Sequence, residues 1–186
     1  MCGFCGVVDL DGRHVAKGLI LDMAQTLYHR GPDSSGVYVS GSTGLGHRRL
    51  KIIDLSDSAN QPMSNEDDTL RVVCNGEIYN YRVLTSQLKA RGHAFRSASD
   101  TEVILHLYEE KGTSCVKDLF GMFAFCLWDH NQKRLILARD RLGVKPLYYY
   151  WNGRLFVFAS EIKALLKHPE ITGELSPQAI PLYQTY

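Results

Sequence analysis

Cys2 is the residue with the clearest chemical potential in this chain, because it directly follows the initiator Met1. A residue this small allows Met1 to be trimmed, which leaves one residue that carries both a thiol and an α-amine. The thiolate is the nucleophilic form of cysteine, and a free thiol has a pKa of about 8.5. An α-amine has a pKa of about 7.7–8.0, so its neutral form is a usable general base, directly or through one water. Cys2 therefore indicates nucleophilic chemistry that needs no separate histidine, although a cysteine at position 2, taken alone, is more often merely tolerated there.

Cys2 and Cys5 also have the spacing of half a zinc site or of a redox motif. A zinc site needs a second pair, which Cys74, Cys115 and Cys126 do not supply. A redox motif sits after a strand at the start of a helix, whereas this one opens an apolar strand. We therefore predict no metal site and no redox role, and an odd, scattered set of cysteines is not a disulfide framework.

Asn75-Gly76 has two interpretations. After a strand, Asn-Gly is most often a hairpin turn, and the spacing alone favours that turn. The alternative is an oxyanion hole with two donors, the Asn75 side-chain NH₂ and the Gly76 backbone N–H, since a glycine lets a reacting carbonyl approach the backbone. The residues that follow, Glu77 to Tyr81, lead towards a helix rather than a partner strand, which keeps the alternative open.

Two further charged positions could bind an amino acid. Arg48-Arg49 is either a solvated surface pair or a bidentate clamp on a substrate carboxylate. Asp100 at a predicted helix start is either stabilised by the helix dipole alone or an acceptor for a substrate ammonium group.

Many short strands and a few helices must position these residues. We predict strands over residues 3–9, 36–39, 43–48, 51–55, 70–74, 122–128, 134–139, 147–151 and 154–159. We predict helices over residues 15–28 and 81–91, from near residue 100, over residues 113–119 and from residue 160, and a connecting loop over residues 57–69. Ser99 and Glu102 have the spacing of a capping box for the third helix. The strands over 122–128 and 134–139 read as buried on both faces, so we expect sheets covered by other layers.

The bulk composition is that of an ordinary soluble protein. The 186 residues are 45% apolar and 22% charged, with a formal net charge of +1. This length suits one domain, and the charge favours neither nucleic acid nor an anionic membrane as a partner. No apolar run approaches the roughly 18 residues of a membrane span, and the N-terminus does not resemble a signal peptide. We therefore expect a cytoplasmic protein.

In order along the chain, the motifs resemble the glutaminase domain of the class II glutamine amidotransferases, and most closely that of the glutamine-hydrolysing asparagine synthetases. The matching segments are Cys2-Gly3, His29-Arg30-Gly31-Pro32-Asp33, Gly46-His47-Arg48-Arg49-Leu50, Asn75-Gly76-Glu77-Ile78-Tyr79-Asn80, Ser99-Asp100-Thr101-Glu102, Gly121-Met122-Phe123-Ala124-Phe125, Ala138-Arg139-Asp140-Arg141-Leu142-Gly143, Lys145-Pro146-Leu147-Tyr148 and Ala159-Ser160-Glu161. The resemblance covers nearly the whole chain. It implies an α+β fold, a four-layer αββα sandwich of two antiparallel sheets, of the N-terminal-nucleophile hydrolase type.

The resemblance also implies a role for each site residue. Cys2 would attack the side-chain amide of L-glutamine to give a thioester and ammonia, with its own amine as proton shuttle. Asn75 and Gly76 would hold the oxyanion. The substrate-binding set would be Arg49 for the α-carboxylate, Glu77 and Asp100 for the α-ammonium, and Leu50, Ile52 and Ile53 for the pocket wall. Arg30 would lie near the nucleophile and order it.

The resemblance further implies a partner. In the family a synthetase domain follows, which binds ATP and Mg²⁺ through a Ser-Gly-Gly-type loop, and residues 1–186 contain no such loop. We therefore expect residues 1–186 to form one glutaminase domain that needs no cofactor of its own, with the synthetase domain or subunit elsewhere. Exposed apolar surface should remain where that partner docks.

Two other interpretations compete with the glutaminase. One is a non-catalytic scaffold that binds a synthetase partner, although a degenerate member of the family should have lost Cys2, Asn75 or Asp100. The other is an N-terminal-nucleophile amidohydrolase with a different substrate, against which Arg49, Glu77 and Asp100 together favour an amino acid.

Overall fold

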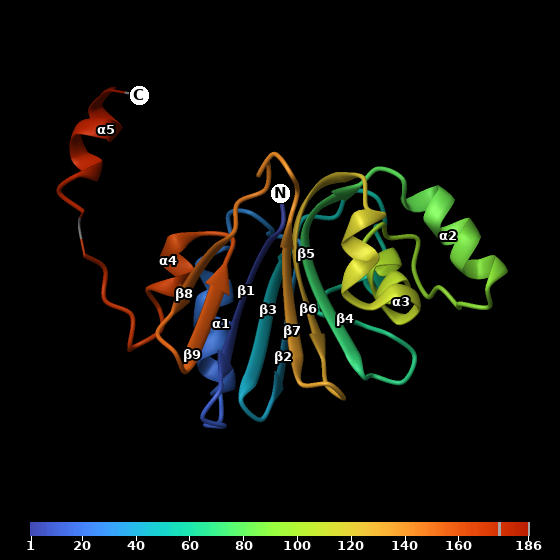
Figure 1. The fold of residues 1–186 in the computed structure, drawn as a ribbon, viewed down its shortest axis with the longest axis horizontal. Helices are drawn as coiled ribbons and strands as arrows, with labels where there is room; N and C mark the ends of the chain where they lie inside the picture. The colour runs from blue at the N-terminus through green and yellow to red at the C-terminus, as the bar shows by residue number, and fades with distance from the viewer. Residues whose placement is uncertain (175, 186) are drawn as a thin grey trace.

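Two antiparallel sheets form the centre of the molecule in the computed structural model, which describes residues 1–174 and 176–185 (Figure 1). The first sheet has the strand order β2-β3-β1-β9-β8. Its strands are β1 (Gly3–Asp9), β2 (Ser34–Ser40), β3 (Thr43–Arg49), β8 (Tyr148–Trp151) and β9 (Leu155–Ala159). The second sheet has the order β4-β5-β6-β7, with β4 (Met63–Ser64), β5 (Leu70–Ile78), β6 (Gly121–Asp129) and β7 (Arg134–Arg139).

Helices cover the outer face of each sheet (Figure 1). α1 (Lys17–Gln25) and α4 (Ile162–Leu165) lie on the first sheet, and α2 (Tyr81–Ala90) and α3 (Glu102–Lys111) lie on the second. Two short 3₁₀ helices, η1 (Asp57–Ala59) and η2 (Gly112–Lys117), occur in connections. α5 (Ala179–Thr185) stands apart from the sheets with its side chains exposed.

Three apolar clusters hold these four layers together. One lies between α1 and the first sheet and contains Met23 and Val157. The second joins the two sheets and contains Phe158 and Val73, and the third joins the second sheet to α3 and contains Leu105. Full burial of one such side chain contributes roughly 1.5–3 kcal/mol. The arrangement confirms the predicted four-layer αββα sandwich.

The central strand of the first sheet shows the effect of this layering. All seven residues of β1 are buried, because one face packs on α1 and the other on the second sheet. The first residues of β1 therefore begin at a fixed place between the layers, and Cys2 directly precedes them.

The predicted strand over residues 51–55 is wrong. This segment is a loop because its backbone groups are bound by side chains instead of a neighbouring strand. The Lys51 N–H donates to Asp33 Oδ2 at 2.8 Å, and the carbonyl oxygens of Asp54 and Ser56 both accept from the Arg49 guanidinium.

Two details of the second sheet also differ from the prediction. β7 is only half buried, because it is the edge strand, whereas β6 is buried over most of its length. The capping box does not form. α3 begins at Glu102 without a side-chain cap, and the Glu102 carboxylate accepts instead from the N–H groups of Arg96 at 2.7 Å and Ser97 at 2.8 Å.

The hairpin turn that spacing alone favoured at Asn75-Gly76 is absent, so the alternative left open for this pair remains. β5 runs on from Leu70 to Ile78 and pairs with β6 throughout. The strands predicted over residues 147–151 and 154–159 do form, as β8 and β9, and they pair as a hairpin around Asn152 and Gly153. None of the helices in the described parts of the chain is both long and apolar enough to cross a membrane.

Candidate active site

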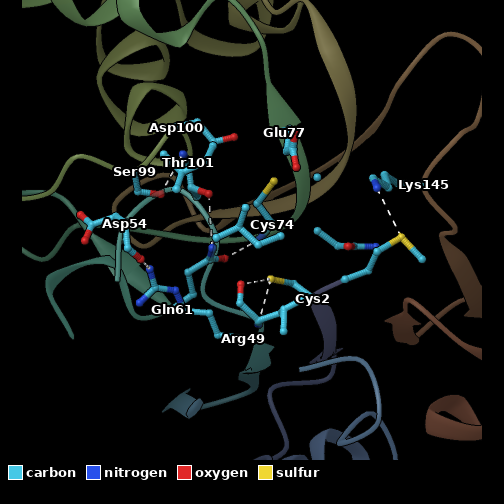
Figure 2. A pocket seen from close by; sticks show the side chains of 16 residues that line it. Cys2, Arg49, Asp54, Gln61, Cys74, Glu77, Ser99, Asp100, Thr101 and Lys145 are labelled. Atoms are coloured by element: carbon cyan, nitrogen blue, oxygen red, sulfur yellow. Dashed lines mark hydrogen bonds between the residues drawn. The ribbon is translucent and has the colours of Figure 1, made fainter. Parts of the chain in front are cut away.

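A hollow of about 60 Å³ lies where β1 begins and β5 ends, and it collects the predicted site residues (Figure 2). Its lining comprises Met1, Cys2, Arg49, Leu50, Ile52, Ile53, Asp54, Gln61, Cys74, Asn75, Gly76, Glu77, Ser99, Asp100, Thr101 and Lys145. Every residue of the predicted set except Arg30 is among them. The lining residues come from six separate stretches of the chain, which thus meet at one place.

Cys2 is half-buried and directly precedes the first residue of β1. Its Sγ is 3.4 Å from the Leu50 backbone N and 3.7 Å from the Leu50 O, so the loop after β3 fixes the position of the sulfur. Burial raises the pKa of the Cys2 thiol, and the hydrogen bond with Leu50 offsets this only in part. The thiol is therefore protonated at neutral pH, and its use as a nucleophile requires a base.

Arg30 lies outside the hollow but binds the backbone of Cys2. Its Nε donates to the Cys2 carbonyl oxygen at 2.9 Å, and its Nη1 donates to Glu161 Oε1 at 2.9 Å. The loop that carries Arg30 approaches β3 closely, since a Cβ on Gly31 would lie 2.4 Å from the Arg48 backbone. Glycine at position 31 is therefore required for Arg30 to reach the start of β1.

Asn75 provides a donor without a partner. The residue is 1% exposed, and its Nδ2 is buried with no hydrogen-bond acceptor among the described residues. Buried polar groups in proteins are almost always hydrogen-bonded, so an unpartnered NH₂ on a residue that lines the hollow indicates a ligand atom that accepts from it.

The Gly76 backbone N–H is a second such donor. Cys74 and Ile78 direct their N–H groups away from β6, to side-chain acceptors at 2.6 and 2.7 Å. Phe123, opposite Gly76 on β6, bonds with both of its backbone groups to Asp140, at 3.2 and 2.7 Å. Because backbone direction alternates along a strand, the Gly76 N–H points the same way as those of Cys74 and Ile78, and the described residues offer it no acceptor.

The glycine at position 76 has a packing reason that the sequence did not reveal. A Cβ there would lie 2.3 Å from the Met122 carbonyl oxygen and 2.5 Å from Phe123 Cα. The close approach of β6 thus excludes a side chain, independently of any substrate.

Arg49 is 5% exposed and orders the loop around the hollow. Its Nη1 donates to the Ser56 carbonyl oxygen at 2.7 Å and to Asn60 Oδ1 at 3.0 Å, and its Nη2 donates to the Asp54 carbonyl oxygen. A guanidinium has more N–H donors than these bonds use. Its Nε has no acceptor within the part of the chain that the structure describes, so this N–H remains for a ligand carboxylate.

Two carboxylates lie on the other side of the hollow, as Figure 2 shows. Asp100 is buried and accepts from the Ile78 N–H through Oδ2 at 2.7 Å, which leaves Oδ1 for a ligand. Burial raises the pKa of Asp100, against the lowering effect of the Ile78 hydrogen bond, and the nearby Glu77 raises it further. A cationic ligand group would offset both effects.

The sequence profile of the family described as "Glutamine amidotransferase domain" matches residues 1–186. The chain belongs to this family. The match includes every residue of the site just described, so the candidate active site lies within the amidotransferase domain.

The amidotransferase domain is similar over most of its length to three curated relatives. It is 46% identical over 178 residues to asparagine synthetase [glutamine-hydrolyzing] 3 of Bacillus subtilis, covering 94% of this chain and 29% of the relative. It is 41% identical over 203 residues to a putative asparagine synthetase [glutamine-hydrolyzing] 2 of Methanocaldococcus jannaschii, covering 98% and 39%. It is 46% identical over 168 residues to asparagine synthetase [glutamine-hydrolyzing] 2 of Arabidopsis thaliana, covering 89% and 28%. The chain therefore spans less than half the length of these relatives.

Solved structures show the same fold. The glutamine phosphoribosylpyrophosphate amidotransferase of B. subtilis, complexed with ADP and GMP, superposes with a TM-score of 0.75 at 24% identity, covering 88% of this chain and 43% of that one. A structure described as the allosteric regulatory enzyme of purine biosynthesis superposes with a TM-score of 0.73 at 23% identity, covering 89% and 43%. These similarities support the fold of the amidotransferase domain.

Among the residues that line the candidate site, the sequence did not single out Gln61 and Lys145. Gln61 accepts from the Cys74 N–H at 2.6 Å and donates to Thr101 Oγ1 at 3.3 Å, so it ties β5 to the start of α3. Lys145 is buried and its Nζ is 3.4 Å from Met1 Sδ. Gln61 lies in a segment that reads only as a polar loop, and no local pattern marks it. Lys145 lies in a motif that matches the family, but its type alone does not place it in the hollow.

Proposed function

We propose that this domain hydrolyses L-glutamine to glutamate and ammonia through a thioester on Cys2. One observation carries the proposal: two donors without partners among the described residues, Asn75 Nδ2 and Gly76 N, belong to residues that line the same hollow as Cys2. That is the arrangement that a tetrahedral oxyanion requires.

The rest of the hollow suits the zwitterionic end of glutamine. The free side of the Arg49 guanidinium would bind the α-carboxylate, and Asp100 with Glu77 would bind the α-ammonium. Leu50, Ile52 and Ile53 would form the wall between the two ends. The side-chain amide of the substrate then reaches Cys2.

The reaction follows from these positions. With Met1 removed, the neutral α-amine of Cys2 takes the thiol proton, and the sulfur attacks the amide carbon of glutamine. The oxyanion receives hydrogen bonds from Asn75 and Gly76. The α-ammonium of Cys2 then passes its proton to the leaving nitrogen of the substrate amide. The C–N bond breaks, which gives ammonia and a thioester on Cys2. Water then cleaves the thioester, again through an oxyanion, and releases glutamate.

Removal of Met1 is part of the proposal. Met1 lines the hollow, which at about 60 Å³ is small beside the roughly 300–1,000 Å³ of a typical ligand pocket. Trimming would enlarge the hollow and place the amine on Cys2 itself. Retention of Met1 would leave the amine one residue away.

The ammonia would serve amide synthesis, as the names of the relatives suggest, with ATP and Mg²⁺ needed only by a synthetase domain or subunit. An apolar hollow of about 560 Å³ on the second sheet suits such a partner. We call it the β6–β7 hollow, and its apolar lining is Tyr79, Val116, Phe120, Met122, Phe123, Ala138, Leu142 and Val144. Leu142 is 89% exposed and Phe120 65% exposed.

The deciding experiment is ammonia release from L-glutamine by the Met1-trimmed chain, with Cys2→Ala as control. Release that disappears in the Cys2→Ala chain supports the glutaminase. A folded, trimmed chain that binds glutamine but releases no ammonia, alone or with a synthetase partner, would instead be the non-catalytic scaffold.

A further inference from the structure

A cluster of two histidines and a glutamate lies on the far side of the second sheet, away from the amidotransferase site. His93 is in the loop after α2, and His106 and Glu109 share one side of α3 at an i, i+3 spacing. One ligand atom from each of these residues lies within 4.8 Å of the other two. The glutaminase proposal assigns them no role.

We propose that His93, His106 and Glu109 bind a divalent transition-metal ion, of which Zn²⁺ is the natural probe. Glu109 Oε2 is 2.9 Å from His106 Nδ1 and 3.2 Å from His93 Nδ1. Ligand atoms about 2.0–2.1 Å from a tetrahedral Zn²⁺ lie about 3.3 Å from one another, so small side-chain adjustments admit the ion. Two imidazoles with one carboxylate suit zinc rather than Mg²⁺ or Ca²⁺, which prefer oxygen ligands.

The groups around His93 have the arrangement of a metal site's outer shell. A ligating histidine usually donates its other N–H to a carboxylate. His93 Nε2 lies 3.0 Å from Glu110 Oε1 in this way. His106 Nε2 is buried without a hydrogen-bond partner among the described residues, and the nearest carboxylate oxygen, Glu102 Oε1, is 3.8 Å away.

Glu109 is oriented as well. Its second oxygen, Oε1, accepts from Asn65 Nδ2 at 2.9 Å, so Oε2 is the oxygen directed at the histidines. The His106 side chain is 1% exposed, whereas His93 is 17% and Glu109 26% exposed. The ion thus has a route from solvent, and water can fill the remaining coordination position.

A metal-free ion-pair network is the competing explanation of the cluster. Burial lowers the pKa of His106, but the carboxylates of Glu102 and Glu109 outweigh it and raise the pKa to about 9. The charged ring would then hold both glutamates. This alternative explains the contacts equally well, but it predicts no metal uptake.

An ion here would fasten the segment after α2 to α3. That segment runs from His93 to Thr101, and its last three residues, Ser99, Asp100 and Thr101, line the amidotransferase hollow. Occupancy would therefore stabilise one wall of the site from the far side of the sheet.

The test is Zn²⁺ titration by calorimetry, with melting temperatures measured with and without Zn²⁺. The Cys2→Ala chain is used as the parent, because the Cys2 thiol is itself a zinc ligand. We expect one ion per chain and a higher melting temperature with zinc. Glu110→Ala should weaken binding by about 10–100-fold, as loss of an outer-shell carboxylate does, and His93→Gln should weaken it further.

The control is His130→Gln, which removes an exposed histidine outside the cluster and should leave zinc binding unchanged. Glu109→Gln tests the third ligand if His93→Gln fails to fold. The absence of zinc uptake by the parent, or equal affinity in the parent and both ligand variants, would overturn the proposal in favour of the ion-pair network.

Discussion

At the scale of single residues, the site is recognised by what is left unpaired. Leaving a buried donor such as Asn75 Nδ2 without an acceptor costs about 1–3 kcal/mol of folding free energy. A neighbouring backbone could have met that need, as the Asp118 carbonyl does for Asn80 at 2.8 Å. A ligand that supplies the acceptor offsets this cost. The donor that destabilises the ligand-free chain is therefore the same donor that we propose for the oxyanion hole.

Asn75→Ala separates the effect of this side chain on stability from its effect on catalysis. We expect kcat to fall by about 10²–10³-fold with little change in KM, because the lost hydrogen bond forms in the transition state. The free energy of unfolding should not decrease, since an unsatisfied group is removed. Steady-state ammonia release and urea unfolding measure both. Asn80→Ala is the matched control and should lower stability while kcat is retained, and the reverse pattern would contradict the assignment.

Asp100 gives a second prediction at this scale. Burial raises its pKa, so the carboxylate loses its charge at a higher pH than an ordinary aspartate. If the charged form binds the α-ammonium of glutamine, KM should rise as the pH falls through this raised pKa. Asp100→Asn should raise KM throughout and remove that part of the pH dependence. A wild-type KM that does not change on the acid side would count against this role.

The residues of the site were predictable mainly because their motifs occur in a known order. Local spacing alone favoured a turn at Asn75-Gly76 and could not assign a role to Arg49. Gln61 was missed because it is a polar loop residue far from any motif. Nothing in the local sequence indicates that its side chain accepts from the Cys74 N–H at the edge of β5. Such contacts depend on three-dimensional proximity, which the fold alone determines.

At the scale of elements, β5 explains why the turn prediction at Asn75-Gly76 failed. An Asn-Gly turn needs a partner strand directly after it, whereas β5 pairs with β6, which follows only after α2, α3 and η2. The continuing strand then presents Asn75 and Gly76 at an edge that β4 does not cover, since β4 pairs only with residues 71 and 72. The open edge is what gives the Gly76 N–H access to the hollow.

Gly76→Ala tests this interpretation of the strand. A Cβ would lie 2.3 Å from the Met122 carbonyl oxygen, so β5 and β6 must separate. We expect a loss of about 1–3 kcal/mol in the free energy of unfolding, as for other overpacked sites, together with reduced kcat. Urea unfolding and ammonia release provide the measurements. Unchanged stability would mean that the strand approach is looser than described.

His47 on β3 joins the two sheets and makes stability depend on pH. Its Nε2 donates to the Cys74 carbonyl oxygen at 3.0 Å, while its Nδ1 is buried without an acceptor among the described residues. Burial lowers the pKa of His47 to about 4. In the unfolded chain the ring takes up a proton below its ordinary pKa of about 6.5, so acid favours unfolding. The contribution is therefore complete above about pH 6.5 and is lost between about pH 6.5 and pH 4.

The size of this effect is about 3 kcal/mol, from the difference between the two pKa values. Urea unfolding of the wild type and of His47→Gln at a series of pH values measures it. The variant should be less stable at neutral pH and should show a shallower loss towards pH 4. Parallel curves for the two chains would contradict the assignment.

At the scale of the whole molecule, the layer order was predictable and the surfaces were not. Apolar runs such as 122–128 identify covered strands, and the resemblance supplies the αββα order. The edge position of β7 and the wrapping of residues 51–55 around Arg49 depend on which segments meet in space. For the same reason, the sequence predicted exposed apolar surface without indicating its place. We propose the β6–β7 hollow as that surface.

The β6–β7 hollow leads to a prediction about coupling. Leu142 projects from the loop after β7, which Asp140 anchors through the N–H groups of Val144 at 2.8 Å and Lys145 at 3.0 Å. Leu142→Glu places a charge in the proposed interface without touching the Cys2 hollow. Glutamine hydrolysis by the isolated chain should persist, whereas amide formed per glutamate released should fall when a synthetase partner is supplied.

The matched control for this prediction is Leu10→Glu, which puts the same charge on another exposed leucine, at the opposite end of β1 from Cys2. Both variants should hydrolyse glutamine like the wild type, so a difference in coupling reports on the surface and not on folding. Equal coupling in the two variants would place the partner on another face. A coupling loss confined to Leu142→Glu would connect the β6–β7 hollow, rather than the site at Cys2, to the use of the ammonia.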